Sequence, residues 1–290
     1  MRRAIRFDLL DKEGSDFKPP RWVLLPGLCC QAVGGLPLNV DTATAAWFLF
    51  YTAAHLMDHV QDLDEPEAWY ADLGNGAALS AATGLFFTAW RVINNLSNES
   101  KDLNGAEVID DFQKSFLTIS AGQFHDLVNP KMTLKQYWQA AEAKSGAFFA
   151  LACRTGARLA GADESRINAF SRFGLQVGLL VQLLDDLEDL NPPPGKGPAH
   201  FGPETNRSIA FIYAREVLPL EAKQHLDEVL KTVSQTDSSR DELLSILDNS
   251  GAGLYLATEK ERHLHLAQLA LEEAEARSPA QEELLALLSP

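Results

Sequence analysis

The stretch DTATAAWFLFYTAAHLMDHVQD, residues 41–62, joins a long apolar run to a pair of aspartates. Alanine, leucine and aromatic residues occur on every side of the helix that this pattern predicts from about residue 42 to residue 62, with Asp41 as its N-cap. Such a distribution is typical of a helix that is buried all round. Asp58 and Asp62 are four residues apart, so they lie about one turn from each other on nearly the same face. The helix therefore ends in paired carboxylates.

A second stretch, QLLDDLEDL at residues 182–190, repeats this arrangement near the end of another predicted apolar helix, with Asp185 and Asp189 at the same spacing. Carboxylates at a helix C-terminus cost about 0.3–1 kcal/mol each, because they face the negative end of the helix dipole. A bound divalent cation would reverse this cost. Oxygen ligands of this kind suit Mg²⁺, which keeps coordination positions for water and substrate phosphates. Together the two pairs predict the handling of a phosphate or diphosphate.

Two alternatives stay open at this point. Each acidic pair, taken singly, is also what a solvated acidic patch at a helix end looks like. His55 and His59 are four residues apart with Asp58 between them, close to the H-x-x-E-H pattern of zinc peptidases. A zinc site would leave the second acidic pair unexplained, and packed histidines are the simpler expectation.

Helical periodicity dominates the rest of the chain, and no alternating strand pattern bounded by turns is found. We predict an all-α protein with further helices at about 66–96, 106–127, 133–161, 164–190, 206–217, 220–234, 239–249 and 252–276, and one after Pro279. The segment NPPPGKGP that begins at Asn191 stops a helix, because proline lacks the donor that the helix needs. Residues 191–205 are predicted to form a mobile loop. Without a repeat or a linker, residues 1–290 are predicted to form a single domain.

Composition narrows the classes of function. The chain has 290 residues, of which 46% are hydrophobic, and a formal net charge of -15. This charge argues against binding to nucleic acid or to an anionic membrane surface. The three cysteines show no metal or redox spacing, and no export signal is recognised, so the cytoplasm is the expected location. The weakly charged run from Leu73 to Trp90 is predicted to be a buried helix and not a membrane span.

Five segments in order resemble the trans-isoprenyl diphosphate synthases, also called polyprenyl synthetases. DHVQD at 58–62 and QLLDDLED from Gln182 resemble the two aspartate-rich motifs of that family. AGQFHDL from Ala121 and AKSGAFFALACRTGARLAGA from Ala143 resemble its G-Q-x-x-D and K-T-G segments. SGAGLYLATEKERHLHLAQLALE from Ser250 is similar to its C-terminal helix.

The resemblance implies an all-α isoprenoid-synthase-type bundle around a deep apolar cavity, and a homodimer. It also implies that three Mg²⁺ ions hold the diphosphate of an allylic substrate, which ionises and is then attacked by isopentenyl diphosphate. The implied metal ligands are Asp58, Asp62, Asp185 and Asp189. Lys144 and Gln182 would contact the allylic diphosphate or its metals, and Arg21, Gln123, Arg207 and Lys196 would bind substrate. Asp186, Glu188, Asp64 and Glu65 are expected to be solvated or to support the ligands from outside.

The chain also departs from the family pattern. His59 stands where the family's first motif has an acid, and no basic residue lies between Asp62 and Arg91, where a pair of arginines is usual. Ala53 and Ala54, just before the first motif, are small and would leave the cavity open toward Phe50, which favours products of about C20 or longer. Three alternatives therefore stay open: a terpene synthase that acts on one diphosphate, a relative that prenylates another acceptor, and a weakly catalytic partner subunit that binds prenyl diphosphate.

Overall fold

The computed structural model describes residues 21–36, 40–61, 74–96, 103–129, 131–190, 206–232 and 237–288. Within these ranges the chain is helical and contains no strand, as predicted. Its elements are η1 (Arg21–Leu24), α1 (Leu25–Val33), α2 (Asp41–Gln61), α3 (Gly74–Asn94), α5 (Leu103–Val128), α6 (Leu134–Ala141), the π-helical turn η3 (Glu142–Gly146), α7 (Ala147–Leu159), α8 (Glu164–Leu190), α9 (Ile209–Val217), α10 (Leu220–Thr232), α11 (Asp237–Ser250), α12 (Ala252–Glu273) and α13 (Ala280–Ala286).

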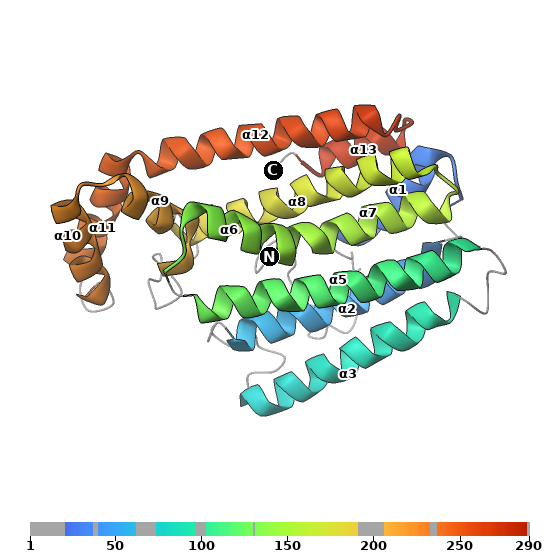
Figure 1. The fold of residues 1–290 in the computed structure, drawn as a ribbon, viewed down its shortest axis with the longest axis horizontal. Coiled ribbons are helices and arrows are strands. Elements are labelled where there is room, and N and C mark those ends of the chain that lie inside the picture. The colour runs from blue at the N-terminus through green and yellow to red at the C-terminus, as the bar shows by residue number, and fades with distance from the viewer. Residues whose placement is uncertain are drawn as a thin grey trace, which may run out of the picture.

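The long helices run side by side along the longest axis of the molecule (Figure 1). Helix α7 packs between α1, α5 and α8, and α2 packs chiefly against α3. Helix α3 lies on one outer side of the bundle, and α12 lies on the opposite side (Figure 1). The short helices α9, α10 and α11 gather at one end, which is the end at which α2, α5 and α8 finish.

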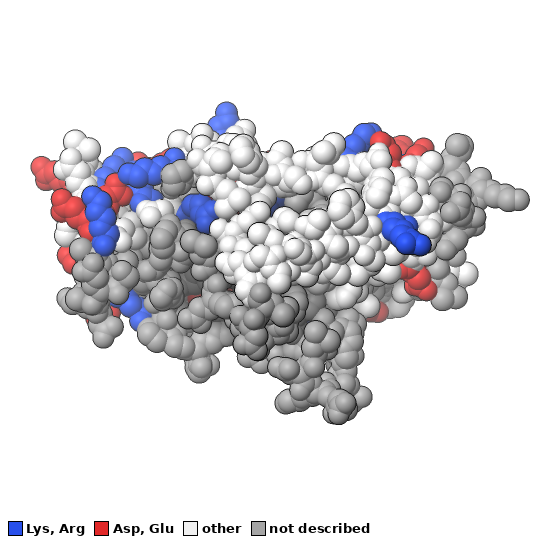
Figure 2. Space-filling model, turned by 90° about the horizontal axis from the view of Figure 1, so that it is seen from below, with Lys and Arg blue, Asp and Glu red and all other residues white. Residues whose placement is uncertain are grey.

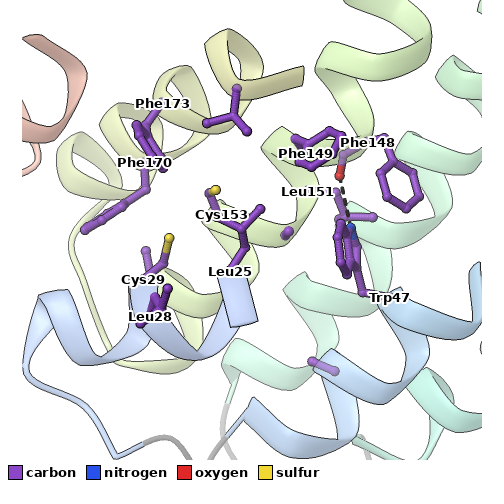
Figure 3. Packing of buried hydrophobic residues seen from close by; sticks show 14 of the residues in the cluster. Leu25, Leu28, Cys29, Trp47, Phe148, Phe149, Leu151, Cys153, Phe170 and Phe173 are labelled. Atoms are coloured by element: carbon purple, nitrogen blue, oxygen red, sulfur yellow. Dashed lines mark hydrogen bonds between the residues drawn. The ribbon is translucent and has the colours of Figure 1, made fainter. Parts of the chain in front are cut away.

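Aromatic and aliphatic side chains from α1, α2, α7 and α8 fill the largest core cluster. Trp47 on α2 lies against Phe148 on α7, with ring centroids 4.9 Å apart, and its indole nitrogen donates a hydrogen bond of 3.1 Å to the Phe148 carbonyl (Figure 3). Cys29 and Cys153 are fully buried in the same cluster (Figure 3). Burial raises the pKa of the Cys29 thiol well above its ordinary value. Cys29 is therefore a small buried residue of the core.

Glycines let α8 approach the neighbouring backbone directly. A Cβ atom at Gly178 would lie 2.3 Å from the Ser145 carbonyl oxygen, and one at Gly174 would lie 2.4 Å from the Phe149 carbonyl oxygen. No real side chain fits at such distances. The closest approach of α8 is therefore to η3 and the first turn of α7.

Helix α3 is not the buried helix that its sequence predicted. Only Ala78, Ala82, Ala89 and Ile93 of this helix are buried, along the side that packs on α2, whereas Phe87 is 70% exposed. Figure 2 views the molecule from the side on which α3 lies, and the described surface there is mostly uncharged along its middle. The sequence pattern failed because alanine and glycine occur on both faces of α3, so burial of one face left the other apolar face exposed.

Two helices in the described ranges have the length and apolar composition that a membrane crossing would need. They are Gly74–Asn94, which is 22% buried within the molecule, and Glu164–Glu188, which is 61% buried. Core helices of water-soluble proteins have the same composition.

His263 on α12 is a buried histidine whose hydrogen bond with α8 should be sensitive to acid. Its Nδ1 lies 2.6 Å from Gln176 Oε1 on α8, and its ring packs against Trp138 on α6 with centroids 5.0 Å apart. Burial and, secondarily, Arg262 lower its pKa from 6.5 to about 4, against the opposing effect of Glu259. The folded protein therefore holds this imidazole neutral.

This lowered pKa predicts how stability depends on pH. Below about pH 6.5 the unfolded chain binds a proton at His263, whereas the folded protein binds it only near pH 4. The free energy of unfolding should thus fall by about 2 kcal/mol more between pH 7 and pH 4.5 in the wild type than in His263→Gln. Urea denaturation at both pH values measures this difference. His225→Gln, at an exposed histidine on α10, is the control and should behave as the wild type. Equal pH dependence of wild type and His263→Gln would contradict the assignment.

Candidate functional site

Asp58 lies in the last turn of α2 and is held from two neighbouring elements. Lys144 Nζ on η3 lies 2.6 Å from Asp58 Oδ1 and donates to it. The amide nitrogen of Gln123 on α5 donates to the same oxygen at 2.9 Å and to Gln61 Oε1 at 3.0 Å. The end of α2 is therefore joined to both α5 and η3.

Acidic and basic side chains alternate next to Asp58, in the order Asp58, Lys144, Asp126 and Arg207. Lys144 Nζ also lies 3.7 Å from Asp126 Oδ2 on α5, and Arg207 lies 3.9 Å from the same oxygen. The side chains of Asp58, Lys144, Asp126 and Arg207 are only 13–19% exposed. Ion pairs in such a partly dry site are stronger and less screened by salt than pairs at the surface.

The π-helical turn η3 lies between the two acidic helix ends. Turns of this kind are rare inside α-helices and are frequent at functional sites. Lys144 contacts Asp58, and the next residue, Ser145, donates from its hydroxyl to Gln182 Oε1 on α8 at 3.0 Å. Adjacent residues of η3 therefore connect the end of α2 with Gln182, about one turn before Asp185 and Asp186 on α8.

Asp186 was expected to be solvated or to support the ligands from outside, and the structure shows it buried and hydrogen-bonded. It is 8% exposed and accepts hydrogen bonds from the Tyr137 hydroxyl and the Ile209 amide, both at 2.9 Å, and a longer one of 3.4 Å from Gln182. Burial, followed by the charge of Asp186, raises the pKa of Tyr137 well above 10, so its hydroxyl remains a donor. A signal was present in the sequence: Leu179, Leu183, Asp186 and Leu190 share the buried face of α8 by their spacing.

The structure brings together most of the predicted site residues that it describes. Asp58, Gln123, Lys144, Gln182 and Arg207 belong to the connected network, and Asp185 precedes the anchored Asp186 on α8. Arg21 is exposed on η1 and makes no hydrogen bond or ion pair with these residues. Asp62, Lys196 and the predicted loop 191–205 lie outside the described residues, as does the side chain of Asp189. Gln61 is the member that sequence reasoning missed.

His55 and His59 are packed histidines, as expected. The His55 ring stacks on Tyr51, and the His59 ring meets it edge-on with centroids 4.5 Å apart. Both residues are buried, whereas Asp58 contacts Lys144 and Gln123. In the part of the chain that can be described, no three His, Cys, Asp or Glu side chains form a metal-binding group.

The donor atoms of the network fit a hard divalent cation. Asp58, Asp126, Gln61 and Gln123 supply only oxygen acceptors and amide groups, which is the donor set that Mg²⁺ prefers. The Gln123 Oε1 atom is buried and has no hydrogen-bond partner in the described structure. An acceptor of this kind is a place where an ion or an ordered water can bind.

The fold and this site define an all-α protein in which one lysine-bearing turn contacts Asp58 at the end of α2 and Gln182, about one turn before Asp185 and Asp186, on α8. Residues 28–247 match the family described as Polyprenyl synthetase, and the chain belongs to that family. It is 31% identical over 189 residues to a geranylgeranyl diphosphate synthase of Mycobacterium tuberculosis, and the match covers 62% of this chain. The chain spans 53% of the length of that relative.

Solved structures share the fold. A polyprenyl synthetase from Streptomyces coelicolor A3(2) superimposes with a TM-score of 0.81 over 95% of this chain and 85% of its own, at 21% identity. A polyprenyl synthase from Caulobacter crescentus CB15, complexed with calcium and isoprenyl diphosphate, has a TM-score of 0.77 at 19% identity and covers 95% and 83% of the two chains. The isoprenoid-synthase-type all-α fold predicted from the sequence is thereby confirmed.

Proposed function

We propose that this chain is a cytoplasmic Mg²⁺-dependent prenyltransferase that condenses an allylic prenyl diphosphate with isopentenyl diphosphate to give a longer trans-polyprenyl diphosphate. One observation carries the proposal: Lys144 and Ser145, neighbours on η3, connect Asp58 at the acidic end of α2 with Gln182, about one turn before the acidic residues of α8. The names of the relatives, a geranylgeranyl diphosphate synthase and a synthase bound to isoprenyl diphosphate, support the substrate class.

In the proposed reaction, the acidic side chains bind cations, and the basic and amide side chains contact the diphosphates or position the acidic ligands. Asp58, Asp62, Asp185 and Asp189 would hold the cations, three of which are expected with a bound diphosphate. Such ions would neutralise the diphosphate as it leaves. Lys144 and Gln182 would orient that diphosphate, and Gln123 keeps Asp58 in place through its two hydrogen bonds. Arg207, Lys196 and Arg21 would supply positive charge for the second diphosphate.

A product assay tests the proposal. Purified protein with Mg²⁺ is given farnesyl diphosphate alone and then together with labelled isopentenyl diphosphate, and extracts are compared before and after phosphatase treatment. Labelled longer alcohols that appear only after phosphatase are expected. Hydrocarbon from farnesyl diphosphate alone would instead identify a terpene synthase, which the absence of basic residues between Asp62 and Arg91 favours. If neither substrate is consumed, the proposal is wrong.

An aromatic group beneath Asp58 is the proposed floor of the hydrocarbon site. Phe50 precedes Asp58 by eight residues on α2, about 12 Å along the helix. Its ring packs on Phe116 of α5 at 4.0 Å and on Phe148 of α7 at 5.2 Å. Ala53, between Phe50 and Asp58, is fully buried and small. A substrate chain extending from the acidic end along α2 would meet these rings, and we propose products of about C20 or longer.

Phe116→Ala should lengthen the products by at least one isoprene unit, because removal of the ring opens the floor below Phe50. Chromatography of the dephosphorylated products measures the change. Phe170→Ala is the matched control, since Phe170 is a buried core phenylalanine on α8 and its loss also leaves a cavity. An unchanged product length in Phe116→Ala, or an equal shift in Phe170→Ala, would contradict this floor.

The exposed apolar surface of α3 and α5 is the proposed homodimer interface. Phe86 on α3 and Phe116 on α5 pack against each other, and the residues next to them, Phe87 and Leu117, are 70% and 74% exposed. Phe124 is 67% exposed on the same face of α5 as Leu117, two turns further on. An apolar surface of this kind on a chain of net charge -15 fits a second copy of itself.

The double variant Leu117→Glu/Phe124→Glu should weaken the dimer at least about a hundredfold, because it buries four charges across a two-fold interface. Sedimentation velocity over a range of concentrations measures the change. Leu254→Glu, at an exposed leucine on α12, should leave the dimer intact. A monomeric wild type, or a double variant that remains dimeric, would contradict the interface.

A further inference from the structure

Lys144 contacts two carboxylates, and binding of a diphosphate alone does not explain these contacts. Its ammonium lies 2.6 Å from Asp58 Oδ1 and 3.7 Å from Asp126 Oδ2. It therefore occupies the position between two carboxylates where a cation would also bind most strongly. Asp58 is one of the residues that the proposed function assigns to cation binding.

The three side chains are well shielded from water. Asp58, Lys144 and Asp126 are 13%, 17% and 19% exposed. Opposite charges at this separation stabilise each other strongly where water is mostly excluded. Two carboxylates in one site would otherwise repel each other, so the lysine supplies the charge that keeps α2 and α5 together at this end.

We propose that Lys144 is the built-in counter-ion of Asp58 and competes with divalent cations for it, so that cation binding releases the ammonium for a phosphate-bearing ligand. The inference rests on the proposed function for its ligand class. It adds a property that the proposed function does not require, namely that the cation and the lysine exclude each other at Asp58.

The neighbouring contacts can remain in place when a divalent cation replaces the Lys144 ammonium at Asp58. Ser145 is bonded to Gln182 on α8, so η3 stays in place while only the Lys144 side chain moves. Asp126 keeps Arg207, at 3.9 Å, when Lys144 leaves. Gln123 still donates to Asp58 and Gln61, so the end of α2 remains joined to α5. Asp58 then has the cation and Asp126 has Arg207 as its cationic partner.

Binding of the divalent cation and binding of the phosphate-bearing anion should therefore be coupled. If the cation frees Lys144 and the anion then binds it, each ligand raises the affinity for the other by the same factor. Removal of the ammonium should therefore change the two affinities in opposite directions. A residue that serves only the structure of the site would weaken both.

Titration calorimetry with Mn²⁺ alone, and with inorganic pyrophosphate in the presence of Mn²⁺, tests the inference on the full chain. Lys144→Met should bind Mn²⁺ alone about tenfold more tightly than the wild type and pyrophosphate at least tenfold more weakly. Lys144→Arg keeps the charge and should keep the weak Mn²⁺ affinity. Lys114→Met removes a surface lysine from its i,i+4 pair with Asp110 on α5 and is the control for charge alone.

The result that overturns the inference is an unchanged or weaker Mn²⁺ affinity in Lys144→Met that keeps the wild-type melting temperature. Absence of Mn²⁺ binding in both proteins overturns it as well. If Lys144→Met melts lower, Lys144→Arg decides: tighter Mn²⁺ binding in that variant too would refute competition by charge. Prenyl transfer is measured in a separate assay. A protein that lacks this activity can therefore be distinguished from one in which Lys144 does not compete with the cation.

Discussion

Asp58→Asn should lower kcat/KM for prenyl transfer by about a thousandfold, the largest effect expected of a substitution in the site. The asparagine keeps the size of the side chain and can still accept from Gln123, but it loses the charge that binds Lys144 and the proposed cations. Steady-state kinetics with labelled isopentenyl diphosphate measures the loss.

The matched control for this variant is Asp110→Asn, which removes a carboxylate from the same bundle at a position 53% exposed on α5. Its activity should remain within a factor of about two, since surface ion pairs contribute little. Activity of Asp58→Asn within tenfold of the wild type would show that the end of α2 does not take part in the reaction.

Gly178→Ala should destabilise the protein by about 3 kcal/mol, through overpacking between α8 and η3. The added Cβ would lie 2.3 Å from the Ser145 carbonyl oxygen and 2.8 Å from the Gly146 Cα, and both are backbone atoms that cannot turn aside. Separation of α8 from η3 would also weaken the Ser145 to Gln182 hydrogen bond. Urea denaturation gives the free energy of unfolding.

Gly253→Ala is the control for this substitution. Gly253 lies in α12, and a Cβ there would meet no atom within 4 Å. Because alanine restricts the unfolded chain, this change should stabilise the protein by about 0.5–1 kcal/mol. Equal stability of the two variants would mean that α8 and η3 are not in the close contact described.

A helix was predictable where the sequence shows both an apolar face and residues that begin and end the helix. Helix α8 occupies residues 164–190 as predicted, because a loop precedes Glu164 and prolines follow Asn191. The segment predicted as one helix at 133–161 is α6, η3 and α7 instead. The π-helical turn lies where Gly178 of α8 approaches its backbone closely, and such a contact between distant segments cannot be read from local sequence.

The candidate site was predictable in its charges but not in its hydrogen bonds. The spacing of Asp58 identified one acidic end, and Gln123 and Lys144 came from the family resemblance. Gln61 was missed, because a glutamine next to an acidic pair has no pattern of its own. For Asp186 the sequence left open whether it is solvated or supports the ligands from outside, because its burial depends on hydrogen bonds from Tyr137 and the Ile209 amide, which are distant in sequence.

We propose that the ends of α2 and α8 form one site for a cation and a diphosphate. Calorimetric titration of inorganic pyrophosphate in the presence of Mg²⁺ into wild type, Asp58→Asn and Asp185→Asn tests it without any need for turnover. We expect each substitution to weaken binding at least about a hundredfold, because both helix ends contribute charge to the same ligand. Wild-type affinity in either variant would contradict a shared site.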